Sequence, residues 1–185
     1  MSILKLSLKV LSTHLIMSLI QVALMPAFFG ILQKNEVYQW IIGIIYIAIF
    51  WLVIYADTSS KGLDDAKADK YKPYKGFIAG LIACIPAFIL YIGALVYPTN
   101  TNGINWFQPA LRIWLVPYIK IFTSFEEAMP HIAIVMALLL PLVTGISYMD
   151  GLRKRQKILM AIEKTDALRN EKSKLGLYNK KNKDK

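Results

Sequence analysis

The chain has 185 residues, of which 56% are hydrophobic and only 18% are charged, and its net charge is +10. Soluble domains usually contain about 45–50% apolar residues, even with glycine included, and about a quarter charged residues. The composition excludes a disordered chain, which needs low hydrophobicity, and disfavours an ordinary soluble domain. The single cysteine, Cys84, excludes a disulfide within the chain and a cysteine-rich metal site.

Four apolar segments are each long enough to cross a bilayer, which takes about 20 residues of α-helix. β-Branched residues are abundant in them, but apolar segments of this length favour helices in lipid. We therefore predict an all-α, polytopic membrane protein whose four-helix transmembrane domain covers residues 1–150. The predicted spans are residues 10–32, 37–56, 76–97 and 130–149.

The connections differ in length and polarity. Residues 33–36 predict a short turn between two antiparallel helices, and residues 57–75 predict a polar, solvated loop with local ion pairs. Residues 151–185 predict a basic cytosolic tail that begins as a helix and becomes disordered from about Lys172.

The positions of lysine and arginine set the orientation, because cytoplasmic connections carry an excess of both. With the N-terminus inside, nineteen of the 22 basic residues face the cytoplasm. Only Lys34, Arg112 and Lys120 then lie outside. We expect both termini of this multi-pass protein to be cytoplasmic.

A further apolar and aromatic segment covers residues 104–122. As a fifth span it would place Arg112 near the bilayer centre, at a cost of about 3 kcal/mol, and would move the basic tail outside. We therefore expect a helix in the outer interface, with Trp106, Trp114 and Tyr118 at the level of the headgroups. The second choice is a re-entrant hairpin packed against the bundle.

Clustered aspartates beside a membrane are typical of Mg²⁺-dependent enzymes that act on lipid diphosphates. Asp64, Asp65 and Asp69 are candidates for such a site. Their spacing departs from the Asp-Gly-x2-Ala-Arg pattern of the CDP-alcohol phosphotransferases and from the Asp-Asp-x2-Asp pattern of prenyltransferases. We therefore assign no catalytic residue, and we expect no metal and no cofactor.

Basic residues of the middle loop and of the tail are expected to form a collar at the cytosolic membrane surface. Such a collar fixes the topology, and it could also bind anionic lipid or an acidic partner. Nucleic acid is a poor partner, because no recognised binding motif accompanies the charge. We call this set the basic collar: Lys61, Lys72, Lys75, Arg153, Lys154, Arg155 and Lys157.

Polar residues within the first span share one helix face. His14, Ser18 and Gln21 follow each other at spacings of four and three residues, and polar groups in lipid usually face the bundle interior. We expect hydrogen bonds to other helices; a proton or substrate path is the alternative. The pair Gly76 and Gly80, like Gly145, predicts close helix packing, either within the chain or against a partner.

Three sequence features resemble small four-helix membrane proteins of low-GC Gram-positive bacteria. They are the aspartate that closes a span in Tyr55-Ala56-Asp57, the stretch 75–83 followed by Pro86, and the segment 145–148 that follows Pro141 and precedes a basic stretch. That group has no established activity. The resemblance implies the four-span topology and a bacterial cytoplasmic membrane.

These observations favour a non-enzymatic accessory or assembly subunit of a larger membrane complex. Its basic cytosolic face would meet anionic lipid or an acidic partner, and its glycine-bearing faces would contact a larger membrane protein. The first alternative is a small transporter, channel or immunity-type protein that works by self-association. The second is a membrane-bound, Mg²⁺-dependent enzyme that modifies lipids.

Overall fold

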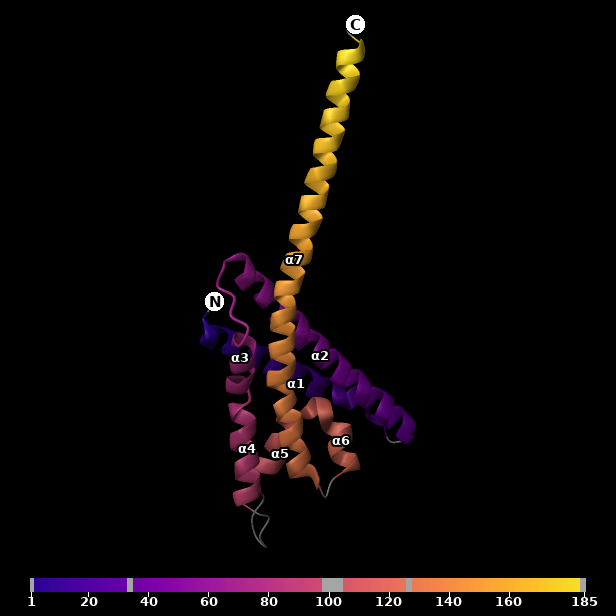
Figure 1. Ribbon diagram of the computed structural model, residues 1–185. Coiled ribbons are helices and arrows are strands. Elements are labelled where there is room, and N and C mark those ends of the chain that lie inside the picture. Colours follow the sequence, from indigo (N-terminus) through magenta and orange to yellow (C-terminus); the bar gives the residue numbers. More distant parts are fainter. Residues whose placement is uncertain (1, 33–34, 98–104, 126–127, 184–185) are drawn as a thin grey trace.

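The computed structural model describes residues 2–32, 35–97, 105–125 and 128–183, and these residues contain helices and short connections but no strand. Three of the long helices, α1, α2 and α7, cross one another in the bundle, while α3 and α4 follow each other along one side (Figure 1). The elements in chain order are α1 (Ile3–Leu32), α2 (Glu36–Lys67), α3 (Lys75–Ala83), α4 (Ile85–Val96), α5 (Phe107–Trp114), η1 (Val116–Tyr118), α6 (Ile119–Ser124) and α7 (Met129–Lys183).

Four helical stretches are long and apolar enough to cross a membrane, as predicted. The first lies in α1, the second in α2, the third combines α3 and α4, and the fourth lies in α7. Pro86 explains the division of the third stretch, because its ring nitrogen has no hydrogen to donate to the preceding turn. The break falls at Cys84, whose backbone nevertheless stays helical, so α4 continues roughly along α3.

Helix α2 is longer than expected, and the prediction of a solvated loop over residues 57–75 was wrong for most of that range. The helix continues to Lys67, about 16 Å past Ala56, where its apolar part ends. Burial of Thr58, Ser59 and Asp65 against α7 stabilises this polar part of the helix. The turn before α3 therefore needs only residues 68–74, and it contains Asp69 at a positive φ of 53°.

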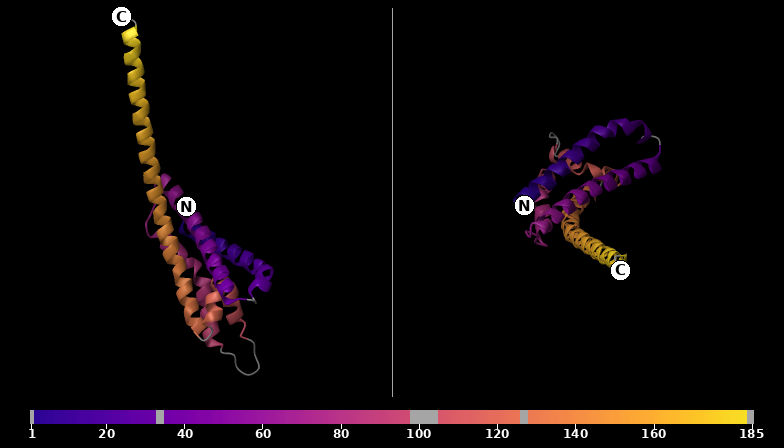
Figure 2. Two further views of the ribbon diagram at one scale, coloured as in Figure 1. Left: turned by 90° about the vertical axis from the view of Figure 1, so that its right-hand side faces the viewer. Right: turned by 90° about the horizontal axis from the view of Figure 1, so that it is seen from above.

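Helix α7 is also longer than expected. The structure has a continuous helix from Met129 to Lys183, whereas we expected the helical part of the tail to end near Lys172. The tail has no proline, and its leucine, lysine and glutamate residues are good helix formers. Residues 153–183, which we call the α7 extension, would be about 45 Å long. The extension projects away from the bundle, as two further views show (Figure 2).

Glycines let α3 approach α7 closely. A Cβ atom on Gly76 would lie 2.6 Å from the carbonyl oxygen of Thr144, and one on Gly80 would lie 2.5 Å from the Cα of Pro141. Gly145 is covered in turn by the ring of Phe77. The glycine-bearing faces are therefore used inside the chain, which corrects the expectation that they contact a larger partner.

The segment that precedes α7 folds back on itself. Helix α5 packs on α4, η1 turns the chain near α1 and α2, and α6 returns beside α2 and α7. Tyr118, in η1, is only 2% exposed, whereas Trp106 is 71% exposed. These aromatic side chains therefore differ widely in burial, and the segment forms a hairpin of α5, η1 and α6 whose tip, at η1, packs against α1 and α2.

Candidate functional site

Polar side chains gather where α2 and α7 leave the apolar part of the bundle. We call this region the α2–α7 junction; it is formed by Tyr55, Thr58, Ser59, Asp65, Lys75, Ser147, Tyr148, Asp150, Lys154 and Arg155. Helical continuation of α2 past Ala56 is what brings its polar residues level with the end of the apolar part of α7.

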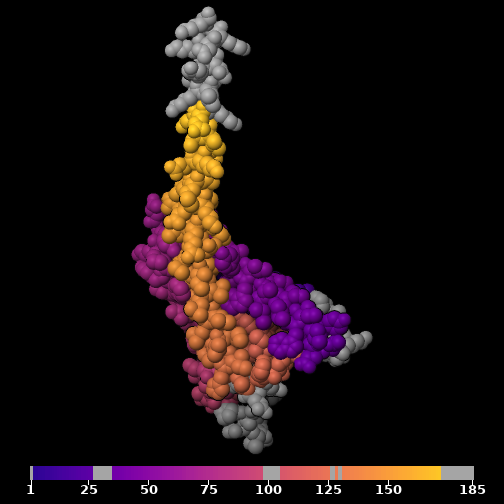
Figure 3. Space-filling model, turned by 45° about the vertical axis from the view of Figure 1, so that its right-hand side comes forward, coloured from indigo at the N-terminus to yellow at the C-terminus, as the bar shows by residue number. Residues whose placement is uncertain are grey.

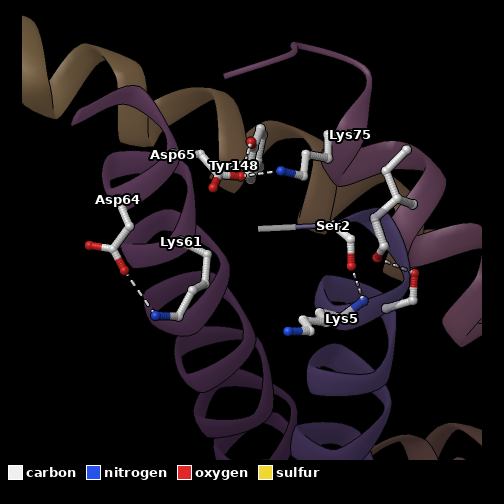
Figure 4. Close-up of polar contacts among 9 residues, drawn as sticks. Ser2, Lys5, Lys61, Asp64, Asp65, Lys75 and Tyr148 are labelled. Carbon is white, nitrogen blue, oxygen red and sulfur yellow. Dashed lines mark hydrogen bonds and ion pairs between the residues drawn. The ribbon is translucent and has the colours of Figure 1, made fainter. Parts of the chain in front are cut away.

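A buried ion pair is the centre of the junction. The Lys75 ammonium contacts the Asp65 carboxylate, and each side chain is only 5% exposed. The Tyr148 hydroxyl donates a hydrogen bond of 2.7 Å to the same carboxylate, and the ring of Tyr71 stacks on that of Tyr148 at 5.3 Å between centroids. Figure 4 shows that the three polar groups come from α2, α3 and α7 and converge on one point.

Asp65 lies about 13 Å along α2 beyond Ala56, outside the apolar part of the helix. Burial favours its neutral form, but hydrogen bonds from Lys75 and Tyr148 favour the carboxylate, and the net result is a pKa below the ordinary value of 3.8. We call Asp65, Lys75 and Tyr148 the buried clamp, because their contacts join α2, α3 and α7.

A second layer of contacts fixes the start of the α7 extension. The Tyr55 hydroxyl donates to Asp150 at 2.6 Å, and the Lys154 ammonium donates to the Ser59 hydroxyl at 2.7 Å. Arg155 donates to the carbonyl oxygen of Ala66 and also contacts Asp69. The first turn of the extension is thereby held against α2.

The basic collar is divided by these contacts. Lys75 is buried and pairs with Asp65, so its side chain does not lie at the surface, where we expected it to meet lipid or a partner; Lys154 and Arg155 bond to α2. Lys61 forms a local pair with Asp64 at 2.9 Å, as expected of an ion pair within this segment. The exposed members are Lys72, Arg153, Lys154 and Lys157, of which Lys154 also bonds to Ser59.

The geometry separates the two aspartates that could have formed a metal site. Asp64 points toward Lys61 on the outer side of α2, while Asp65 points inward toward Tyr148 and Lys75 (Figure 4). Among the described residues, no group of three or more His, Cys, Asp or Glu side chains could hold a metal ion together. The arrangement of Asp64 and Asp65 suits a structural role better than phosphate chemistry.

The polar face of α1 is buried and bonded to other elements. The carbonyl oxygen of Trp114 accepts hydrogen bonds from His14 Nε2 at 2.8 Å and from Ser18 Oγ at 3.1 Å. Gln21 donates from Nε2 to the carbonyl oxygen of Tyr46 at 2.9 Å. The structure thus places all three residues on the inner face, with the interhelical bonds that the sequence predicted.

The structure also brings in residues that sequence reasoning missed. Tyr148 and Tyr55 end apolar segments, where a tyrosine usually turns its hydroxyl to water, so no signal marked them as partners of aspartates. Trp114 takes part through its backbone carbonyl, which no side-chain pattern reveals. The nearest signal was Pro117, which indicates a break in the segment and so a turn near Tyr118.

The α7 extension carries an apolar stripe that nothing in the chain covers among the described residues. Ile158, Ala161, Ile162, Thr165 and Leu168 follow helical spacing, and Ile162 is 52% exposed. At about 100° per residue, Lys157 and Lys164 border one side of this stripe and Asp166 borders the other, while Arg169 lies within it and Glu163 lies opposite. The coloured part of the extension, which carries this stripe, projects beyond the bundle in the space-filling view (Figure 3).

In comparisons with known proteins, no family model, no curated protein and no solved structure matches the chain.

Proposed function

We propose that the chain is a non-enzymatic accessory or assembly subunit of a larger membrane complex, and that the α7 extension is its docking element. The bundle would anchor it in a bacterial cytoplasmic membrane through four spans, with both termini in the cytoplasm. The observation that carries this proposal is the exposed apolar stripe, with lysines along one edge, on a helix that projects from the bundle.

The distribution of charge supports the orientation. The N-terminal end of α1, the α2–α3 connection and the α7 extension all lie toward the same end of the molecule (Figures 1 and 2). Residues 1–9, 57–75 and 151–185, which include these segments, contain nineteen of the 22 basic residues, and cytoplasmic segments of membrane proteins carry such an excess.

The chemistry of the stripe supports a protein partner with acidic groups. An apolar row at helical spacing is the usual ligand of a hydrophobic groove on another protein. Carboxylates at the rim of that groove would meet Lys157, Lys164 and Arg169.

The packing of the bundle supports the role of an anchor. The close-packing glycines are occupied within the chain, and the cavity beside His14 at the bundle centre measures only about 10 Å³. Such a centre offers little room for a solute path through one subunit. The transporter alternative would therefore need a path between subunits.

Purification of the tagged full-length protein from its native membrane in a gentle detergent would test the proposal, with native sizing and mass spectrometry as readouts. Two variants with the same change of charge sharpen the test, because Ile162 and Leu159 are each 52% exposed. Ile162→Asp places a carboxylate in the stripe, whereas Leu159→Asp places one outside it.

We expect one partner in stoichiometric amount with the wild type and with Leu159→Asp, and its loss with Ile162→Asp. The partner should also dissociate at high salt, because exposed charges contribute to the contact. A homo-oligomer without a partner would contradict the docking role and would favour the transport alternative. Retention of the partner by Ile162→Asp would exclude the stripe as the contact.

A further inference from the structure

The tip of the hairpin formed by α5, η1 and α6 meets α1 at a histidine whose hydrogen-bonding state the geometry fixes. His14 is 3% exposed, and its ring stacks on that of Trp114 at 4.9 Å and meets the ring of Phe50 edge-on at 5.1 Å. Its Nε2 atom lies 2.8 Å from the carbonyl oxygen of Trp114. A carbonyl oxygen only accepts hydrogen bonds, so Nε2 carries the hydrogen, and Nδ1 of the neutral ring is an acceptor.

Two buried polar atoms near this contact have no hydrogen-bond partner among the described residues: His14 Nδ1 and the Tyr118 hydroxyl. Buried polar atoms are nearly always paired, either with protein groups or with an ordered water molecule. One is an acceptor and the other can donate, so a single small molecule that both donates and accepts could satisfy the two.

His14 and Tyr118 line the same cavity, whose volume is about 10 Å³. A cavity of about 10–15 Å³ is the smallest that holds one water molecule. The rest of its lining is apolar apart from Cys84 and the indole rings of Trp51 and Trp114, and the Cys84 thiol already donates to the carbonyl oxygen of Ala137 at 3.0 Å. His14 Nδ1 and the Tyr118 hydroxyl are therefore the lining groups that still need a hydrogen-bond partner.

We infer that this cavity is a binding site for one water molecule, which donates to His14 Nδ1 and accepts from the Tyr118 hydroxyl. His14 would then hold both sides of the hairpin tip, since Nε2 binds the end of α5 directly and Nδ1 reaches η1 through the water. The site holds the hairpin against α1, independently of any partner of the α7 extension.

Solid-state NMR on the full-length protein in lipid bilayers, with ¹⁵N-labelled histidine, tests this site. The chain has only two histidines, and His131 is exposed, so the two ring signals are readily assigned. We expect His14 as the Nε2–H tautomer, an Nδ1 resonance displaced in the direction caused by an accepted hydrogen bond, and magnetisation transfer from water to the ring.

Tyr118→Phe removes one partner of the water and keeps the aromatic packing. It should displace the His14 Nδ1 resonance and weaken the transfer from water, while the Nε2 signal stays in place. Tyr97→Phe is the matched control, because Tyr97 is 61% exposed and stacks on Phe107 away from the cavity. A wild-type His14 protonated at Nδ1, a ring that receives no magnetisation from water, or an Nδ1 resonance unchanged by Tyr118→Phe would each overturn the inference.

Discussion

Replacement of Lys75 by methionine is the sharpest test of the α2–α7 junction. Methionine keeps most of the length of the side chain but removes the ammonium group that contacts the Asp65 carboxylate, and both side chains of this pair are only 5% exposed. Removal of one partner of a buried ion pair costs about 3–5 kcal/mol. The Tyr148 hydroxyl still donates to Asp65, so we expect the lower end of this range.

The chain contains a matched control one turn from Asp65. Lys61 pairs with Asp64 on the outside of α2, where the two side chains are 28% and 53% exposed. Exposed pairs contribute about 0–1 kcal/mol, so Lys61→Met should change stability little.

The free energy of unfolding of both variants can be measured by denaturant titration in mixed micelles. Equal losses for Lys75→Met and Lys61→Met would show that the buried clamp does not hold the helices together. That result would refute its assignment as the centre of the junction.

Three further predictions follow from the same geometry. The pKa of Asp65 in the folded protein is below 3.8, so the carboxylate contributes its full stabilisation at a pH above the pKa of the unfolded chain and loses it as the pH falls through the lower pKa of the folded state. Unfolding midpoints measured from pH 7 to pH 2 should therefore drop in this acid range. The drop should be smaller in Asp65→Asn. Gly80→Ala places a methyl group 2.5 Å from the Cα of Pro141, so thermal unfolding should reveal a loss of about 1–3 kcal/mol; an unchanged midpoint would contradict the close packing of α3 on α7. In a cysteine-free background, Lys72→Cys should react with a membrane-impermeant maleimide only in inverted vesicles and Trp106→Cys only in intact cells, and the opposite pattern would exclude the proposed orientation.

The sequence was sufficient for the features that depend on composition over long segments. Four apolar runs predicted four helices able to span a membrane, and the spacing of His14, Ser18 and Gln21 predicted one inward face. Both predictions rest on local periodicity, which a single sequence contains in full.

The missed features depend on contacts between distant segments. Residues 57–67 are polar and appeared to be a loop, but burial of Asp65 against Lys75 and Tyr148 keeps them helical. A lysine beside a membrane usually faces water, and the sequence around Lys75 does not indicate that its side chain pairs with Asp65. The hairpin tip was equally hidden, because its bond to His14 uses a backbone carbonyl.

The continuity of α7 has a mechanical consequence. One uninterrupted helix runs from the apolar interior of the bundle through the α2–α7 junction to Lys183. Lys154 and Arg155 hold the first turn of the α7 extension against α2. A helix is stiff along its axis, so a small change in the tilt of α7 within the bundle becomes a large sideways displacement at its far end. The extension is therefore a lever arm, and the position of any protein held at Ile162 would report how the spans are tilted.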